Sequence, residues 1–332
     1  MPSPALVTGA TGFVGRHLVD ALRKSGRRVR ALVRDPGKFL SVFPDPSGIE
    51  IHRGDMEDAK ILNGAVQGAE VIFHVAGVTK ALHNQDFDKV NHQAARLLYE
   101  AVRAQGLRPR IVHVSSLAAA GPSPGPEPPE DFSESRPVTR YGRSKLMGEE
   151  ALREILPGLP WTIVRPPVVF GPGDTDVLHF FRAVARGLNP ILGHDRKLVS
   201  LVYVTDLAEA LARAADAASA IGKTYYVGYD RAYRWSELGA IAARLMGRSC
   251  RSVAIPLEIA WIGAAFAQIL GRIRRKPTIL NLEKLREAQQ DYWVCSPAAA
   301  TRDFGFCPGK PLEGAFEETI AWYREHGHLP SH

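Results

Sequence analysis

Cysteine is scarce in this chain of 332 residues, and no metal-ligand spacing occurs. The three cysteines, Cys250, Cys295 and Cys307, are far apart and form no CxxC pair, which indicates neither a disulfide framework nor a zinc site. The histidines form no HExxH motif, and His74 and His113 fall inside predicted strands, where a buried, hydrogen-bonded imidazole is ordinary. We therefore predict a reducing compartment and no metal.

The sequence also lacks a secretory leader and a concentrated basic stripe. Residues 1–10 enter an apolar strand pattern without the basic region and apolar core of a signal peptide. The net charge of +7 suits an anionic cofactor, a membrane surface or nucleic acid, but the basic residues are scattered and no zinc-finger or RNA-binding signature occurs. We expect a cytoplasmic protein that does not bind nucleic acid.

The chain does contain a regular alternation of strand and helix patterns. Hydrophobic residues make up 45% of it, enough to bury a large core. Amphipathic stretches separate six short β-branched runs: ALVTG, RVRALV, IEIHR, EVIFHVAG, IVHVSS and WTIVR. This alternation predicts an α/β protein with a doubly wound parallel sheet covered by helices on both faces.

A glycine-rich turn follows the first predicted strand in the stretch TGATGFVGRHL. Its spacing is GxxGxxG, which lets the backbone approach a pyrophosphate at the positive end of the next helix. Glycine also serves ordinary tight turns, but a ligand crevice is expected at the first βα connection of a doubly wound fold. We predict that a dinucleotide binds Gly9, Thr11, Gly12, Phe13, Val14 and Gly15.

The second predicted strand ends where dinucleotide-binding proteins distinguish NAD from NADP. An acidic residue there binds the ribose 2′-hydroxyl of NAD, whereas arginine suits the 2′-phosphate of NADP. Val33 and Arg34 hold these places, so we predict a preference for NADP(H), with Lys38 as an additional cation. Asp35, the next residue, leaves binding of NAD(H) possible. Alternatively, Arg34 is a solvent-exposed charge at the end of a strand without a role in cofactor binding.

Tyr141 and Lys145 are one helical turn apart in the stretch TRYGRSKLMGEE. Such pairs meet on one helix face in many proteins without any function. A phenol with a pKa of about 10 is a poor base at neutral pH, but a neighbouring ammonium favours the phenolate. Because hydride transfer to or from nicotinamide needs proton transfer at the substrate oxygen, the pair is a catalytic candidate beside a cofactor site.

Five motifs in order resemble the extended short-chain dehydrogenase/reductases, the NAD(P)-dependent epimerase/dehydratase group: TGATGFVG, HVAG, VSSLAAAG, YGRSK and RPPVVFGP. The match covers nearly the whole chain. RALVRDP resembles the dihydroflavonol-reductase branch, and the C-terminal third is similar in layout to bacterial 3β-hydroxysteroid dehydrogenase-like members. The resemblance implies a Rossmann domain over 1–165 with a returning segment near 199–218, and a smaller, mostly helical substrate domain from 166–198 and 219–332.

The resemblance also implies the catalytic residues. Tyr141 would be the general acid/base, Lys145 would support it and bind the nicotinamide ribose, and Ser116 would hold the substrate oxygen. Ser115 is the alternative serine. Asn91 matches the family asparagine that is proposed to hold a helix distortion and a proton-relay water.

The positions that match family motifs imply further cofactor contacts. Asp55 and Met56 match the pair beside the adenine, Ala76 and Gly77 match the backbone under the cofactor, and Pro166 matches the contact to the nicotinamide amide. Asp55 as the cap of the following helix is an equally strong interpretation.

Two features of the sequence outside the cofactor motifs predict an apolar substrate. Family members that act on nucleotide sugars commonly carry an arginine seven residues before the aspartate of the VYVTD element, and that position is Val199 here, with Arg196 or Lys197 as substitutes. Residues 256–276 combine an apolar helix pattern with a basic end, Arg272, Arg274, Arg275 and Lys276. We expect either a buried helix or peripheral contact with an anionic membrane.

The leading prediction is an NAD(P)-dependent oxidoreductase that interconverts a secondary alcohol and a ketone on a sterol-like, lipid-like or flavonoid-like substrate. A nucleotide-sugar epimerase or dehydratase with the same triad is the alternative, and a non-catalytic NADPH sensor is the third. The Pro- and Gly-rich residues 121–137 predict a substrate-side lid or a plain linker. Relatives often dimerise through the helices that carry Asn91 and Tyr141, so we expect a homodimer.

Overall fold

The six predicted runs form strands of one parallel sheet. The computed structural model describes residues 3–131, 134–264 and 282–330. The strands are β1 (Ala5–Thr8), β2 (Val29–Val33), β3 (Ile49–Arg53), β4 (Val71–His74), β5 (Arg110–Val114) and β6 (Trp161–Arg165). A seventh strand, β11 (Lys223–Tyr226), completes the order β11-β6-β5-β4-β1-β2-β3. This is the Rossmann order, whose ligand crevice lies where β1 and β4 diverge at their carboxyl ends.

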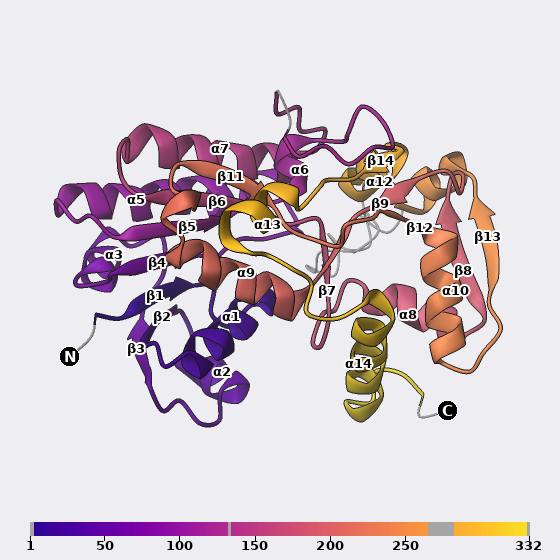
Figure 1. Cartoon of the computed structure of the whole chain (residues 1–332), viewed down its shortest axis with the longest axis horizontal. Coiled ribbons are helices and arrows are strands. Elements are labelled where there is room, and N and C mark those ends of the chain that lie inside the picture. Colours follow the sequence, from indigo (N-terminus) through magenta and orange to yellow (C-terminus); the bar gives the residue numbers. More distant parts are fainter. Residues whose placement is uncertain (1–2, 132–133, 265–281, 331–332) are drawn as a thin grey trace.

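Helices cover both faces of the sheet, as predicted (Figure 1). One face carries α3 (Ala59–Val66), α5 (Ala94–Ala104) and α7 (Arg140–Ile155). The other carries α1 (Phe13–Lys24), α2 (Pro36–Val42) and α9 (Val204–Asp216). Each helix buries an apolar stripe at helical spacing; on α1 this stripe includes Leu18, Val19 and Leu22, which are fully buried. Two separate hydrophobic cores therefore sandwich the sheet.

The returning segment reaches further than the sequence predicted. Strand β10 (Leu201–Tyr203) pairs with β7 (Val168–Phe170), and α9 then packs beside α1. The chain next adds β11 to β6 in parallel, so the predicted domain boundary at 219 is wrong for this strand. Polar Lys223 and Thr224 open the short run and hide its strand pattern, whereas Tyr225 and Val227 are buried in the core.

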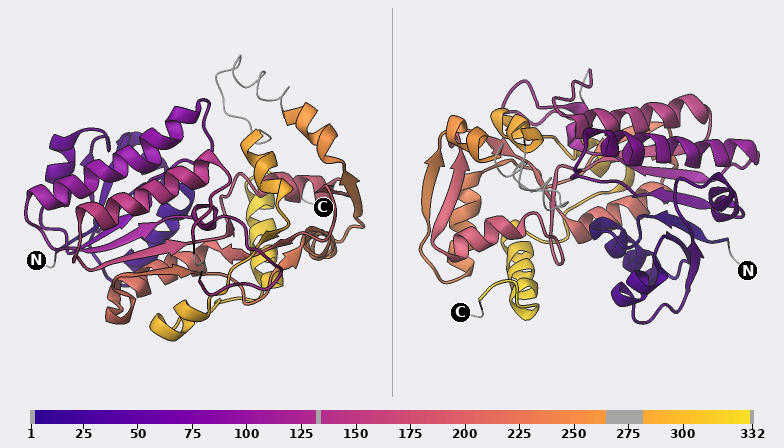
Figure 2. Two further views of the ribbon diagram at one scale, coloured as in Figure 1. Left: turned by 90° about the horizontal axis from the view of Figure 1, so that it is seen from above. Right: turned by 180° about the vertical axis from the view of Figure 1, so that it is seen from behind.

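A smaller unit lies beside the sheet (Figure 2). Its helices are α8 (Leu178–Ala185), α10 (Trp235–Leu245), α12 (Leu282–Gln289) and α14 (Leu312–Glu325). Its strands are β8 (Leu188–Leu192), β9 (Leu198–Val199), β12 (Tyr233–Arg234), β13 (Arg251–Ile255) and β14 (Tyr292–Trp293). An aromatic cluster fills its core, where the Phe316 ring meets Phe170 and Phe181 edge-on at 5.1 Å between centroids.

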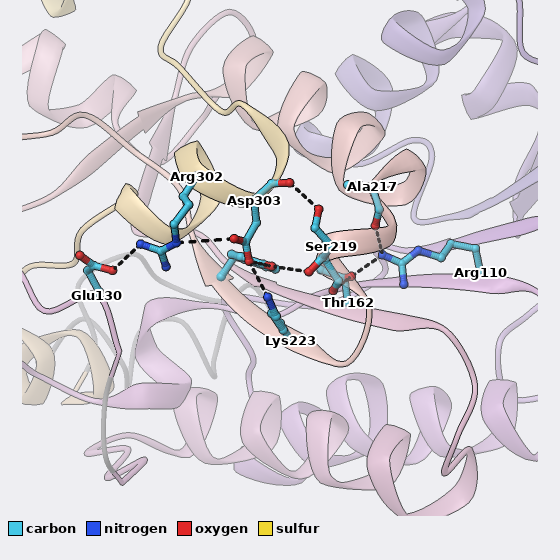
Figure 3. A network of polar contacts seen from close by, with 10 residues as sticks. Arg110, Glu130, Thr162, Ala217, Ser219, Lys223, Arg302 and Asp303 are labelled. Atoms are coloured by element: carbon cyan, nitrogen blue, oxygen red, sulfur yellow. Dashed lines mark hydrogen bonds and ion pairs between the residues drawn. The ribbon is translucent and has the colours of Figure 1, made fainter.

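The described part of residues 121–137 is fastened to the C-terminal region. The Ser123 amide donates to the Tyr292 carbonyl at 2.8 Å, and the Ser296 amide donates to the Pro129 carbonyl at 2.9 Å. Figure 3 shows Glu130 paired with Arg302 on α13 (Ala298–Phe304), next to the Asp303 network that reaches β11. Residues 121–131 thus meet a part of the chain more than 150 positions later in the sequence.

Within the described ranges, no helix is long and apolar enough to span a bilayer. Residues 257–264 are helical, with Ala260 and Ala264 buried against Leu285 of α12. Residues 265–276 of the predicted apolar and basic stretch lie outside the described residues.

Candidate active site

The glycine turn forms a tight backbone cradle at the end of β1. Gly9 has a φ of +73°, and a Cβ on it would lie 2.7 Å from the Ala76 amide nitrogen. A Cβ on Gly15 would lie 2.0 Å from the Gly9 carbonyl oxygen, so glycine is required at both positions. Helix α1 starts at Phe13 without a side-chain cap on its first amides. A tight glycine turn followed by uncapped amides at the start of α1 fits a pyrophosphate at this position.

Arg34 extends from the end of β2 into solvent, with 80% of its side chain exposed. Its guanidinium is 4.0 Å from a carboxylate oxygen of Asp55. Asp35 caps α2 instead, because its Oδ1 accepts the Lys38 amide at 3.1 Å. Asp58 is the cap of α3, so the alternative role of Asp55 as that cap is wrong.

Met56 follows Asp55 in the loop after β3, at the predicted adenine side, and packs against the core beneath α3. Pro166 directly follows β6, and its carbonyl accepts the Leu117 amide at 2.9 Å. The Ala76 amide donates to the Thr8 hydroxyl at 3.2 Å, which ties the loop after β4 to the end of β1.

Lys145 is buried beneath this loop. Its Nζ donates to the Val114 carbonyl at 2.7 Å, at the end of β5. A Cβ on Gly77 would lie 3.5 Å from that Nζ and 3.0 Å from Asn91 Oδ1, so the predicted cofactor backbone runs past both side chains. Burial lowers the pKa of Lys145 to about 8, although the Glu149 carboxylate opposes the shift.

Asn91 lies in a π-helical turn, Asp88–Gln93, directly before α5. Its Oδ1 accepts the Val78 amide at 2.8 Å, and its Nδ2 donates to the Val78 carbonyl at 3.0 Å and to Ser144 Oγ at 3.0 Å. A Cβ on Gly148 would lie 2.6 Å from the Asn91 carbonyl oxygen. The distorted turn is therefore held against both the cofactor loop and α7.

Tyr141 and Ser116 meet at the carboxyl end of β5. Ser116 caps the short helix α6 (Leu117–Ala120), where its Oγ accepts the Ala118 amide at 3.1 Å, and its side chain lies near enough to Tyr141 to favour the phenolate. Helix α7 approaches α6 closely, because a Cβ on Gly142 would lie 2.1 Å from the Ala118 carbonyl oxygen. Burial raises the pKa of Tyr141, and the nearby Ser116 hydroxyl and the charge of Lys284 oppose the shift only in part. The phenol is therefore protonated at neutral pH.

Ser115 points into a different network. Its hydroxyl donates to Glu149 Oε1 at 2.5 Å, and Arg165 holds both oxygens of Glu149 at 2.8 Å. Arg165 also donates to Tyr226 OH and Ser135 Oγ, each at 2.9 Å. Of the two serines, the structure brings Ser116 to Tyr141 and assigns Ser115 to a buried ion pair.

The structure adds charged residues that the sequence reasoning missed. Helix α12 places Lys284 near Tyr141, with Lys284 Nζ 2.7 Å from Glu287 Oε2. Lys80, in the loop after β4, pairs with Asp176, whose charge also acts on Tyr141 and Lys284. The i,i+3 spacing of Lys284 and Glu287 is that of an ordinary surface pair, so it carries no functional signal in the sequence.

Comparison with known proteins settles the family. The model of the NAD-dependent epimerase/dehydratase family matches residues 5–228. The chain belongs to this family. A ceramide reductase from Caulobacter vibrioides is 35% identical over 98% of this chain and 95% of its own length. Sterol demethylase protein B from Methylococcus capsulatus is 28% identical over 97% of this chain and 98% of its own length.

Solved structures agree with the Rossmann fold of this epimerase/dehydratase-family protein. A UDP-glucuronic acid 4-epimerase from Bacillus cereus, in complex with UDP-glucuronic acid and NAD, superposes with a TM-score of 0.78. The match covers 97% of this chain and 99% of the epimerase at 18% identity, and supports the fold alone. Family membership and relatives named as reductase and demethylase identify an NAD-dependent enzyme.

Proposed function

We propose that this enzyme reduces the ketone of a long-chain, ceramide-type lipid to a secondary alcohol. The observation that carries the proposal is the meeting of Tyr141 with Ser116 at the carboxyl end of β5, where partial burial of the phenol keeps it protonated. A protonated phenol holds the proton that reduction of a carbonyl requires, and the Lys145 ammonium would counter the raised pKa by stabilising the phenolate as the proton leaves. The similarity to a ceramide reductase over nearly the full length of both chains supports the substrate class.

The chain's own residues would manage the proton. NADPH, when bound, supplies the hydride that adds to the carbonyl carbon. Tyr141 donates its proton to the carbonyl oxygen, and Ser116 orients that oxygen by a hydrogen bond. The Lys145 ammonium stabilises the phenolate that remains, and Asn91 holds the turn through which a water can return the proton.

The cofactor proposal is a preference for NADP(H). Arg34 is exposed at the end of β2, where the adenine ribose of a dinucleotide is expected. Asp35, the acidic residue that could bind the ribose 2′-hydroxyl of NAD, already accepts a hydrogen bond as the cap of α2. The exposed guanidinium, held only by a 4.0 Å ion pair with Asp55, and the engaged carboxylate of Asp35 together favour a 2′-phosphate over a 2′-hydroxyl.

Nucleotide sugars fit the substrate side less well. Val199 stands where nucleotide-sugar enzymes commonly carry an arginine, and it is buried in the aromatic core of the smaller unit. Lys197 is buried as well and donates to the Ala288 carbonyl. Of the predicted substitutes, Arg196 is the exposed one. The epimerase alternative therefore has weaker support than lipid reduction.

Peripheral contact with a membrane is a further proposal for a lipid enzyme. The described part of the predicted helix is amphipathic: Ile259 is 62% exposed and Ile262 is 73% exposed, whereas Ala260 and Ala264 are buried. Two isoleucines facing water on adjacent turns suit insertion among lipid headgroups. The basic end of the stretch lies outside the described residues.

A substrate panel tests the proposed function. Purified protein is incubated with NADPH or NADH and a ketone form of ceramide, a sterol ketone or UDP-glucose, and cofactor oxidation or sugar epimerisation is followed. We expect rapid oxidation of NADPH with the ceramide ketone. Efficient conversion of UDP-glucose without reduction of either lipid ketone would refute the proposal in favour of the epimerase.

A further inference from the structure

Helix α12 is fixed onto the start of the catalytic helix α7. Glu283 Oε2 accepts the Arg140 amide at 2.6 Å, one residue before Tyr141. At the other end of α12, the Trp293 indole donates to the Glu287 carbonyl at 2.8 Å, and Leu285 is fully buried. These anchors give α12 a defined position at the start of α7, one residue from Tyr141.

The next residue, Lys284, carries a positive charge at this position. Its Nζ lies 2.7 Å from Glu287 Oε2. Burial opposes the charge, but Glu287, Tyr141 and Asp176 outweigh it, so the pKa of Lys284 is raised. Lys284 therefore remains an ammonium at neutral pH.

The pair formed by Lys284 and Glu287 is accessible to a ligand. The Lys284 side chain is 39% exposed and the Glu287 side chain 18% exposed. The ammonium donates hydrogen bonds and the carboxylate accepts them, so the pair matches a group that does both. The pair has no net charge, and the nearby Asp176 is itself paired with Lys80, so the described residues offer no excess positive charge to a phosphate or carboxylate.

We propose that Lys284 and Glu287 form a subsite for a neutral group that both donates and accepts hydrogen bonds, an amide or a hydroxyl, on the carbon beside the reacting carbonyl. This inference rests on the proposed reduction of a lipid ketone and narrows its substrate class. A ceramide-type ketone carries an amide at that carbon. A sterol ketone has only hydrocarbon there, so it leaves the subsite without a polar partner.

Two matched substrates test the subsite. One is a long-chain ketone with an acylamide on the neighbouring carbon, and the other is an unsubstituted ketone of the same chain length. The ratio of their kcat/KM values is measured for the wild type, Lys284→Met, Lys284→Arg and Glu287→Gln. We expect the wild type to prefer the amide ketone and Lys284→Met to reduce the ratio about 10- to 100-fold, the loss of a hydrogen bond to a charged group. Lys284→Arg should retain most of the preference, and Glu287→Gln should lose part of it.

Lys223→Met is the matched control. Lys223 is also a half-exposed lysine in an ion pair, 2.8 Å from Asp303. It begins β11, at the amino end of the sheet, whereas the site lies at the carboxyl ends. The ratio should stay at the wild-type value in this variant.

The outcomes separate the subsite from the proposed function. If the wild type reduces both ketones and Lys284→Met keeps the wild-type ratio, the subsite is refuted and the reductase stands. If the wild type reduces neither ketone, the proposed function fails, and calorimetric binding of the two corresponding alcohols to the NADP⁺ complex decides the subsite. The subsite is supported if the wild type binds the amide alcohol more strongly and Lys284→Met abolishes this preference. It is overturned if both alcohols bind equally, or if Lys284→Met leaves the preference intact.

Discussion

Acidification should destabilise the protein through His74. This residue ends β4, is fully buried, and has its Nδ1 2.9 Å from the Thr8 hydroxyl. Burial, with a smaller contribution from the Lys145 ammonium, lowers the pKa of His74 to about 3. The folded protein therefore keeps the imidazole neutral over a pH range in which the unfolded chain protonates it.

The magnitude follows from proton linkage. Between the ordinary histidine pKa of 6.5 and the folded value of about 3, the unfolded state binds one more proton, so stability falls as pH falls. This contribution is fully present above pH 6.5. Each pH unit below it costs about 1.4 kcal/mol, which gives about 2 kcal/mol at pH 5. Domains are stable by only about 5–15 kcal/mol, so the effect is measurable.

Buried carboxyl groups act in the opposite direction. Burial raises the pKa values of Asp174 and Asp206 to about 6, so the folded state binds their protons first and gains stability as pH falls toward 4. The total change with pH therefore mixes opposing contributions. The difference between wild type and His74→Gln isolates the histidine.

Urea unfolding at pH 7 and pH 5 is the assay. Between these pH values, the free energy of unfolding should fall by about 2 kcal/mol more in the wild type than in His74→Gln. The exposed His326 provides the control, and His326→Gln should follow the wild type. If His74→Gln loses as much stability as the wild type over this range, the buried neutral imidazole is not the cause.

Four further predictions concern function. Tyr141→Phe should reduce kcat about 10²–10⁴-fold while NADPH binding measured by fluorescence is retained; near wild-type turnover would contradict the general-acid role. Arg34→Ala should remove the preference for NADPH over NADH in binding titrations, and an unchanged preference would exclude the 2′-phosphate contact. Ile259→Asp combined with Ile262→Asp should abolish co-sedimentation with anionic liposomes at low salt. The control Ile221→Asp changes another exposed isoleucine, just before β11, and should leave co-sedimentation intact. Absence of wild-type binding would refute membrane contact. We also propose a homodimer through α5 and α7, which light scattering would show as twice the mass of 36.3 kDa, and a monomer at micromolar concentration would refute it.

Strand and turn patterns made most of the fold predictable. Six β-branched runs became β1 to β6 because a parallel sheet buried on both faces requires continuous apolar strands. The glycine turn was recognisable because only glycine permits the backbone approach seen between Gly9 and Gly15. The strand β11 was missed because two polar residues open it and only tertiary packing defines it.

The candidate site was predictable where its residues are local in sequence. Tyr141 and Lys145 share one helix, so their spacing indicated their proximity. Lys284 lies near Tyr141 because α12 packs onto the start of α7, where Glu283 accepts the amide of Arg140, 143 positions away. No local pattern in the sequence records such a contact. The last of the five family motifs, RPPVVFGP, also ends at residue 172, well before α12.

The return of the chain to β11 has a consequence for folding and for recombination. The polypeptide leaves the sheet after β6, builds part of the smaller unit, and comes back to close the sheet edge; later Ala300 and Phe306 enter the same core. Edge pairing between β6 and β11 joins residues 61 positions apart, Arg165 and Tyr226, so closure of this sheet edge has a loop-entropy cost that local contacts do not have. A single crossover between related genes would also split the sheet from its own last strand. Exchange of substrate specificity among relatives therefore requires at least two junctions, one on each side of the returning segment.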